Sequence, residues 1–188
     1  MPSRNEAYQL LCGWVQSESL RKHLLCVEAA MRAYAQKFGE DPEVWGVCGL
    51  LHDFDYEKYP KYDAAVKTGH PFEGVRHLQS LGYPENIIAA ILGHALYSNV
   101  SRTSNMAKAL FACDELCGFL LACALMRPDR LTSLDAKSVR KKLKDKKFAA
   151  KVSREDIQRG IAELGIDADE HINFVISALR GISQDLGF

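Results

Sequence analysis

Val44-Trp45-Gly46-Val47-Cys48-Gly49-Leu50-Leu51-His52-Asp53-Phe54-Asp55 is an apolar run that ends in an adjacent histidine and aspartate. Removing water from an unpaired charge is costly, so polar side chains at the end of a buried segment need a partner. An imidazole nitrogen beside a carboxylate oxygen suits a divalent transition metal ion. The pair by itself is more typical of an ordinary polar helix end than of a metal site, so the rest of the chain must decide.

Other histidines and an aspartate lie on both sides of this pair. His23 lies upstream, His70 and His94 lie downstream, and Asp114 lies inside an otherwise apolar segment. Imidazole nitrogens combined with carboxylate oxygens favour Fe, Mn, Ni or Zn over Mg, which prefers oxygen ligands. The pattern therefore predicts a site for one or two divalent metal ions.

The same ordered set resembles the HD-domain superfamily of metal-dependent phosphohydrolases, and the resemblance covers roughly residues 18–126. It implies a core set of four metal ligands and two further histidines, which are found in those branches of the superfamily that bind two metal ions. The expected metal ligands are His23, His52, Asp53, His70, His94 and Asp114. By resemblance, Asp53 bridges the two ions, and His70 and His94 complete the second site.

The resemblance also implies an activity. We expect a phosphohydrolase that acts on a nucleotide or another small phosphate ester through a metal-activated water, as either a phosphomonoesterase or a phosphodiesterase. Asp53, Asp55 and Glu57 are the expected catalytic residues, the last two by orienting water or by giving a proton to the leaving group. The candidates for binding phosphate are Lys58, Lys61, Lys67 and Arg102.

Two alternatives use the same residues. The ligand set also resembles the di-iron oxygenases of this superfamily, in which an iron pair activates O2. A module that binds a metal or a nucleotide without catalysis is the third possibility, although a bridging carboxylate is less needed there. Iron content together with O2 consumption separates the oxygenase from the hydrolase.

Length and charge limit the possible classes of protein. The 188 residues suffice for one domain, in which a metal-binding core of about 18–126 precedes a helical extension of about 130–188. Lysine plus arginine and aspartate plus glutamate both number 24, so the formal net charge is zero. This balance argues against a nucleic acid polymer as the partner. The basic run at 140–147 is interpreted as a solvated face.

The six cysteines do not form a disulfide or zinc pattern. None belongs to a CxxC pair, and most lie in apolar surroundings, which is typical of reduced thiols in a cytoplasmic protein. The first residues lack the features of a signal peptide, and the longest apolar run, 119–126, is too short to cross a bilayer. We therefore expect a cytoplasmic location and no membrane partner. Nothing in the sequence specifies an oligomeric state.

The periodicity of apolar residues predicts an all-α fold, an HD-type helical bundle with extra C-terminal helices. Strand-like alternation is absent, and glycine and proline fall between the helical segments. The predicted helices span about 5–15, 17–38, 41–53, 70–82, 83–94, 105–126, 153–165 and 169–182. Ser153 and Asp156 resemble a capping box at the start of the seventh predicted helix.

Overall fold

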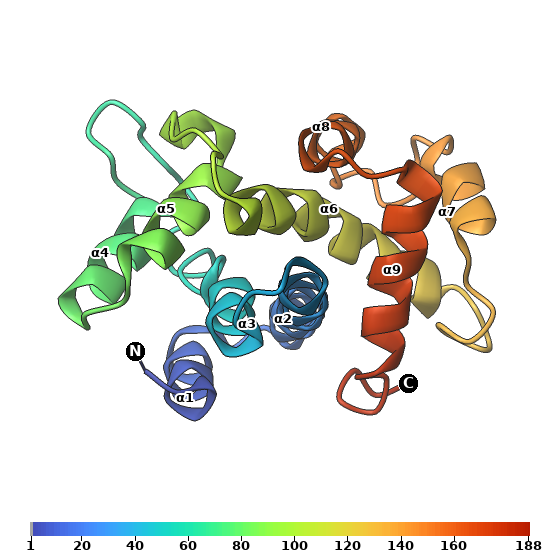
Figure 1. Ribbon diagram of the computed structural model, residues 1–188, viewed down its shortest axis with the longest axis horizontal. Coiled ribbons are helices and arrows are strands. Elements are labelled where there is room, and N and C mark those ends of the chain that lie inside the picture. The colour runs from blue at the N-terminus through green and yellow to red at the C-terminus, as the bar shows by residue number, and fades with distance from the viewer. Residues whose placement is uncertain (1) are drawn as a thin grey trace.

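The all-α prediction is confirmed by the computed structural model, which describes residues 2–188 (Figure 1). Within that range the chain forms nine α-helices, one short 3-10 helix and no sheet. The first five helices are α1 (Arg4–Trp14), α2 (Glu18–Phe38), α3 (Pro42–Leu51), α4 (Phe72–Ser80) and α5 (Glu85–His94). They are followed by η1 (Leu96–Ser98), α6 (Asn105–Leu125), α7 (Ala136–Leu143), α8 (Arg154–Leu164) and α9 (Ala168–Arg180).

Most helices begin at a residue whose side-chain oxygen accepts a backbone N–H of the first turn. Such caps satisfy amide groups that lack a partner inside the helix. The capping residues are Ser3, Ser17, Asp41, Ser104, Asp135, Ser153 and Asp167. Gly39 and Gly165 end α2 and α8 with φ +71, a left-handed conformation that glycine adopts without a steric penalty.

Helices α2 and α3 pack closely because two glycines of α3, Gly46 and Gly49, face α2. A Cβ at Gly49 would lie 2.8 Å from the Val27 carbonyl oxygen of α2. This approach places His52, the residue that follows α3, near His23 of α2, with their ring centroids 5.3 Å apart. A tight helix contact therefore brings together two of the expected ligands.

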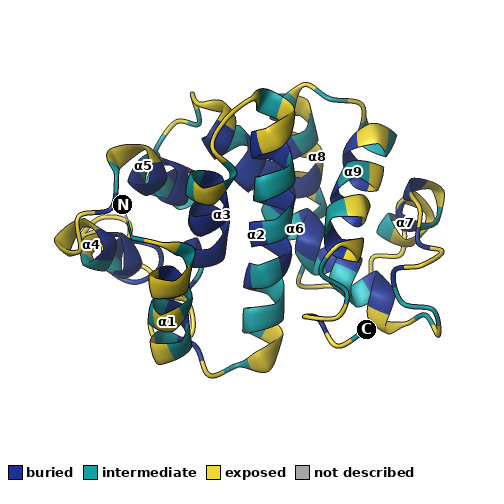
Figure 2. Ribbon diagram, turned by 60° about the horizontal axis from the view of Figure 1, so that its bottom comes forward, coloured by how far each residue is buried: buried dark blue, intermediate teal, exposed yellow. Residues whose placement is uncertain are grey.

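Helix α6 runs through the middle of the molecule, between α2 and α3 on one side and α8 on the other (Figure 1). Its contact with α8 is also tight, because a Cβ at Gly160 would lie 2.6 Å from the Ala112 Cα. Buried apolar side chains from Ala7 to Leu186 form one continuous cluster around α6, and the exposed faces of the helices point outwards (Figure 2).

Three details of the C-terminal part differ from the sequence prediction. The basic region begins with a helix, α7, that the apolar periodicity did not predict, since only Ala136 and Val139 of this helix are buried. The last helix begins at Ala168 instead of Asp169, because the Asp167 carboxylate caps it. That helix ends at Arg180, so Ile182 lies beyond it.

The six cysteines are free, as expected, and all but Cys12 are buried. None of the helices in the described part of the chain combines the length and the apolar character needed to cross a membrane.

Candidate metal centre

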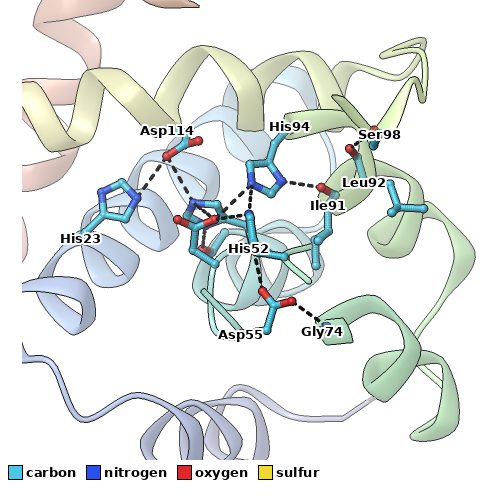
Figure 3. Close-up of polar contacts among 12 residues, drawn as sticks. His23, His52, Asp55, Gly74, Ile91, Leu92, His94, Ser98 and Asp114 are labelled. Carbon is cyan, nitrogen blue, oxygen red and sulfur yellow. Dashed lines mark hydrogen bonds and ion pairs between the residues drawn. The ribbon is translucent and has the colours of Figure 1, made fainter. Parts of the chain in front are cut away.

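One group of four side chains converges from three helices (Figure 3). His23 comes from α2, His52 and Asp53 follow α3, and Asp114 comes from the middle of α6. Their four ligand atoms all lie within 4.8 Å of one another. The Asp114 Oδ1 atom lies 3.1 Å from His23 Nε2 and 3.3 Å from His52 Nε2. Each of these side chains can therefore contribute one atom to the same ion.

A second group shares Asp53 with the first. It consists of Asp53, His70 and His94, again with ligand atoms within 4.8 Å of one another. The Asp53 Oδ1 atom lies 3.2 Å from His70 Nε2 and 3.1 Å from His94 Nε2. All six residues expected as ligands from the sequence thus lie in two adjoining groups, joined by one carboxylate.

The hydrogen bonds of the histidine rings fit a metal ion. The Nδ1 atom of His52 donates to the Gly49 carbonyl at 2.8 Å, and that of His94 donates to the Ile91 carbonyl. A neutral ring that donates from Nδ1 keeps a lone pair on Nε2, which is the atom that faces the carboxylates. His70 Nδ1 donates likewise to Asp55 Oδ1 at 2.6 Å.

The Nε2 atoms of His70 and His94 lie only 3.2 Å apart. In the neutral rings both atoms carry lone pairs, so they repel each other unless a proton or a cation lies between them. Four imidazole nitrogens and two carboxylates form a donor set that suits a divalent transition metal. The residues present therefore fit the expected ions.

The two carboxylates are nearly buried, with 18% of each side chain exposed. Burial alone would raise the pKa of Asp114, but His52 and His23 hold it well below its usual range. Asp53 likewise has a lowered pKa, because His52, His94 and His70 outweigh the effect of burial. Burial alone would lower the pKa of His52, but the charges of Asp53 and Asp114 raise it to about 9. The pair of carboxylates strongly favours positive charge at this position.

A cavity of about 390 Å³, which we call the metal cavity, opens onto both groups. Tyr56 and Tyr97 line it on the side of the second group, and the Tyr97 hydroxyl donates to the His70 carbonyl at 3.0 Å. Glu115 and Asp156 also line it, and neither was predicted from the sequence. Glu115 could have been predicted near the site from the sequence, because it directly follows the expected ligand Asp114.

Asp156 belongs to α8, in the segment expected to be a mere extension. The predicted capping box at Ser153 and Asp156 forms only in part: the Ser153 hydroxyl accepts the Asp156 N–H, but the Ser153 N–H donates to Glu115 Oε2 at 3.0 Å. Burial and the charge of Asp114 together raise the pKa of Glu115 to about 7. Helix α8 thus completes a wall of the metal cavity.

Two of the three expected catalytic residues lie away from the metal cavity. Asp55 is fully buried, and its carboxylate accepts from His70 Nδ1 and from the Gly74 N–H, the latter at 2.7 Å. Glu57 is exposed and accepts the N–H groups of Gln16 and Ser17 at 3.0 and 2.9 Å, just before α2. Neither carboxylate is free to act on water or on a leaving group, so the geometry does not support that expectation.

The candidate phosphate-binding cations do not line the metal cavity either. The Lys58 amine lies 4.1 Å from the centroid of the Trp14 ring. Arg102 pairs with Glu163 and donates to the Gly93 carbonyl, and its side chain is only 9% exposed. The side chains of Lys58 and Arg102 are thus engaged in contacts outside the metal cavity. Lys61 and Lys67 are exposed on the loop between α3 and α4.

A family model described as the HD domain matches residues 20–118. The match spans more than half of the 188 residues and includes all six expected ligands. No curated protein and no solved structure matches the chain.

Proposed function

The chain belongs to the HD-domain family, and on this basis we propose that it is a metal-dependent hydrolase of a nucleotide or another small phosphate ester. Proteins of this superfamily are generally metal-dependent phosphohydrolases, and the two groups of histidine and aspartate side chains supply the donors that such chemistry requires.

One observation carries the proposal. The Asp53 Oδ1 atom lies 3.6, 3.2 and 3.1 Å from the Nε2 atoms of His52, His70 and His94. A single carboxylate oxygen therefore belongs to both candidate metal groups, which is the arrangement expected for a residue that holds two ions near each other. A site for a single ion does not need a carboxylate oxygen that is shared by two groups of ligands.

The proposed ligands are His23, His52, Asp53 and Asp114 for one ion, and Asp53, His70 and His94 for the other. When bound, such ions supply Lewis acidity toward a phosphoryl oxygen and acidify water, which makes water a nucleophile at neutral pH. Asp55 is proposed as a positioning residue, because its hydrogen bond holds the His70 ring and directs Nε2 toward Asp53. Glu115 and Asp156 offer hydrogen-bond acceptors to a substrate in the metal cavity.

The direct test is phosphate release by protein reconstituted with Mn, Fe, Ni, Zn or Mg. The substrates would be nucleoside phosphates, dinucleoside polyphosphates and sugar phosphates. We expect metal-dependent release that falls by at least about a thousandfold in Asp53→Ala, the loss typical of removing an essential catalytic group. Glu57→Gln is the matched control, because it removes a carboxylate four residues away outside the metal cavity, and it should retain activity.

Two outcomes would overturn the proposal. Activity that survives Asp53→Ala would come from a contaminant or from another site. Tightly held iron, O2 consumption and no phosphate release would indicate the di-iron oxygenase instead, since the same nitrogen-rich donor set also suits iron.

A further inference from the structure

A second cavity lies beside α7 and the start of α8. We call it the basic cavity, and its volume is about 650 Å³. Four cations and one acidic residue line it: Arg140, Lys144, Lys146, Arg154 and Glu155. Leu143, Val152 and Ile157 supply apolar surface. The cavity therefore combines an excess of positive charge with a place for an uncharged group.

The positive charge is concentrated in one part of the chain. Residues 137–154 contain nine lysines and arginines and a single acid, Asp145, although the whole chain has a net charge of zero. Arg140 is paired with Asp169 at 3.2 Å. Lys144, Lys146 and Arg154 have no carboxylate within ion-pair distance among the described residues. Three unpaired cations therefore line the same cavity, where they attract an anion.

Arg154 fixes the wall of this cavity. Its guanidinium donates to four backbone carbonyls, those of Asp145, Phe148, Ala149 and Val152. These bonds hold the 145–152 segment in one shape, while the guanidinium carbon lies 4.9 Å from the centroid of the Phe119 ring. The buried Arg154 Nε has no hydrogen-bond acceptor among the described residues. The charge is thus held in place by carbonyl dipoles and is not neutralised by them.

The first residues of α8 add to the attraction. Ser153, Arg154 and Glu155, which line the basic cavity, are the N-cap and first residues of this 11-residue helix. The partial positive charge of a helix N-terminus favours anions, and phosphate groups above all. The same segment separates the two cavities, since the Ser153 N–H is bonded to Glu115 of the metal cavity.

From this arrangement we propose that the basic cavity is a second ligand site, which binds a small organic anion carrying several phosphate groups, such as a nucleoside polyphosphate. The phosphates contact Lys144 and Lys146 near the start of α8, and the organic part lies against the apolar surface. Several negative charges match the several unpaired cations, and charge-assisted hydrogen bonds to phosphate are the strongest contacts these side chains make.

Isothermal titration calorimetry with ATP and with inorganic triphosphate tests this site. EDTA is present throughout, so that neither metal binding nor hydrolysis contributes. The test variant is Lys144→Glu/Lys146→Glu. The matched control is Lys147→Glu/Lys151→Glu, which makes the same change in net charge at two exposed lysines of the same segment that do not line the cavity.

We expect one ATP per chain and at least tenfold weaker binding by the test variant, with less than a threefold change in the control. Binding should persist in Asp53→Ala, and inorganic triphosphate should bind more weakly than ATP because it lacks the organic part. Lys144→Gln/Lys146→Gln, which removes charge without reversing it, should weaken binding in the same direction. Circular dichroism verifies that each variant is folded.

Three results would overturn the proposal. Equal losses in the two double variants would mean diffuse attraction by the whole basic segment. Loss of binding in Asp53→Ala would place the ligand in the metal cavity. A DNA or RNA duplex that binds more tightly than ATP, with equal sensitivity to both double variants, would identify a polymer as the partner.

Discussion

The Asp55 carboxylate is fully buried and accepts a hydrogen bond from His70 Nδ1 at 2.6 Å, while His70 Nε2 lies 3.2 Å from Asp53. The bond fixes which nitrogen of the ring carries the proton and which faces the candidate metal centre. Partners of this kind orient metal-binding histidines and raise their basicity. The Gly74 N–H completes the arrangement by donating to the other Asp55 oxygen at 2.7 Å.

Replacing Asp55 should weaken metal binding without removing a ligand. In Asp55→Asn the charge is lost and an amide group meets either the Gly74 N–H or the His70 Nδ1–H, so the His70 ring is less firmly held. We expect affinity for one of the two ions to fall by roughly 10- to 100-fold, measured by calorimetry with Mn or Zn. Glu57→Gln is the control and should bind as the wild type does. Unchanged affinity in Asp55→Asn would show that Asp55 only fills space.

Single substitutions should separate the two ion sites. His23→Ala removes a donor only from the first group, and His94→Ala removes one only from the second. Each variant should retain one tightly bound ion and bind the other far more weakly, as counted by elemental analysis after dialysis. If either variant lost both ions together, the groups would not act as separate sites.

The contact between α6 and α8 should tolerate no added methyl group. In Gly160→Ala the new Cβ would lie 2.6 Å from the Ala112 Cα, and backbone atoms cannot move aside without shifting a helix. We expect the free energy of unfolding to fall by about 1–3 kcal/mol in urea titrations. Gly13→Ala is the control, because nothing lies within 4 Å of its Cβ, and alanine at this helical position should be neutral or stabilising.

His171 should make the protein less stable in acid. Burial lowers its pKa to about 4, while its ring bonds to the Tyr34 hydroxyl and the Ala112 carbonyl. An unfolded histidine has a pKa near 6.5, so the unfolded state binds more protons between these values, and stability falls as pH falls through that range. The expected contribution is about 2 kcal/mol between pH 7 and pH 5.

The measurement is the free energy of unfolding in urea at both pH values with EDTA, for wild type and for His171→Gln. The variant should lose less stability on acidification than the wild type, because glutamine does not titrate. An identical pH dependence in the two proteins would mean that His171 does not contribute.

Part of the signal for the candidate ligands lies in the sequence itself, because His52 and Asp53 end an apolar run and Asp114 interrupts an apolar helix, and the structure brings these residues close to the other histidines. Val27 shares the inner face of α2 with His23, and both lie toward α3 and α6. The expected set of six ligands came from the order of the histidines and aspartates along the chain, which resembles that of the HD-domain superfamily. Apolar periodicity, with glycine and proline between the helical segments, predicted the limits of eight helices to within one or two residues.

The surroundings of the ligands could not be predicted in the same way. Asp156 reaches the metal cavity only because Gly160 allows α8 to approach α6, and nothing in the periodicity of either helix specifies that contact. From its residue type and its place two residues after Asp53, Asp55 could be a catalytic carboxylate. Its role, however, depends on where His70 and Gly74 lie after folding. Residues far apart in the chain set these functions, so local patterns miss them.

The most direct test of the account is the number of divalent ions bound per chain by the wild type and by Asp53→Ala, measured by elemental analysis and calorimetry on folded protein. Because Asp53 belongs to both groups, the account predicts two ions in the wild type and the loss of tight binding at both sites in the variant. Two ions retained by Asp53→Ala, or no ion bound by the wild type, would contradict it.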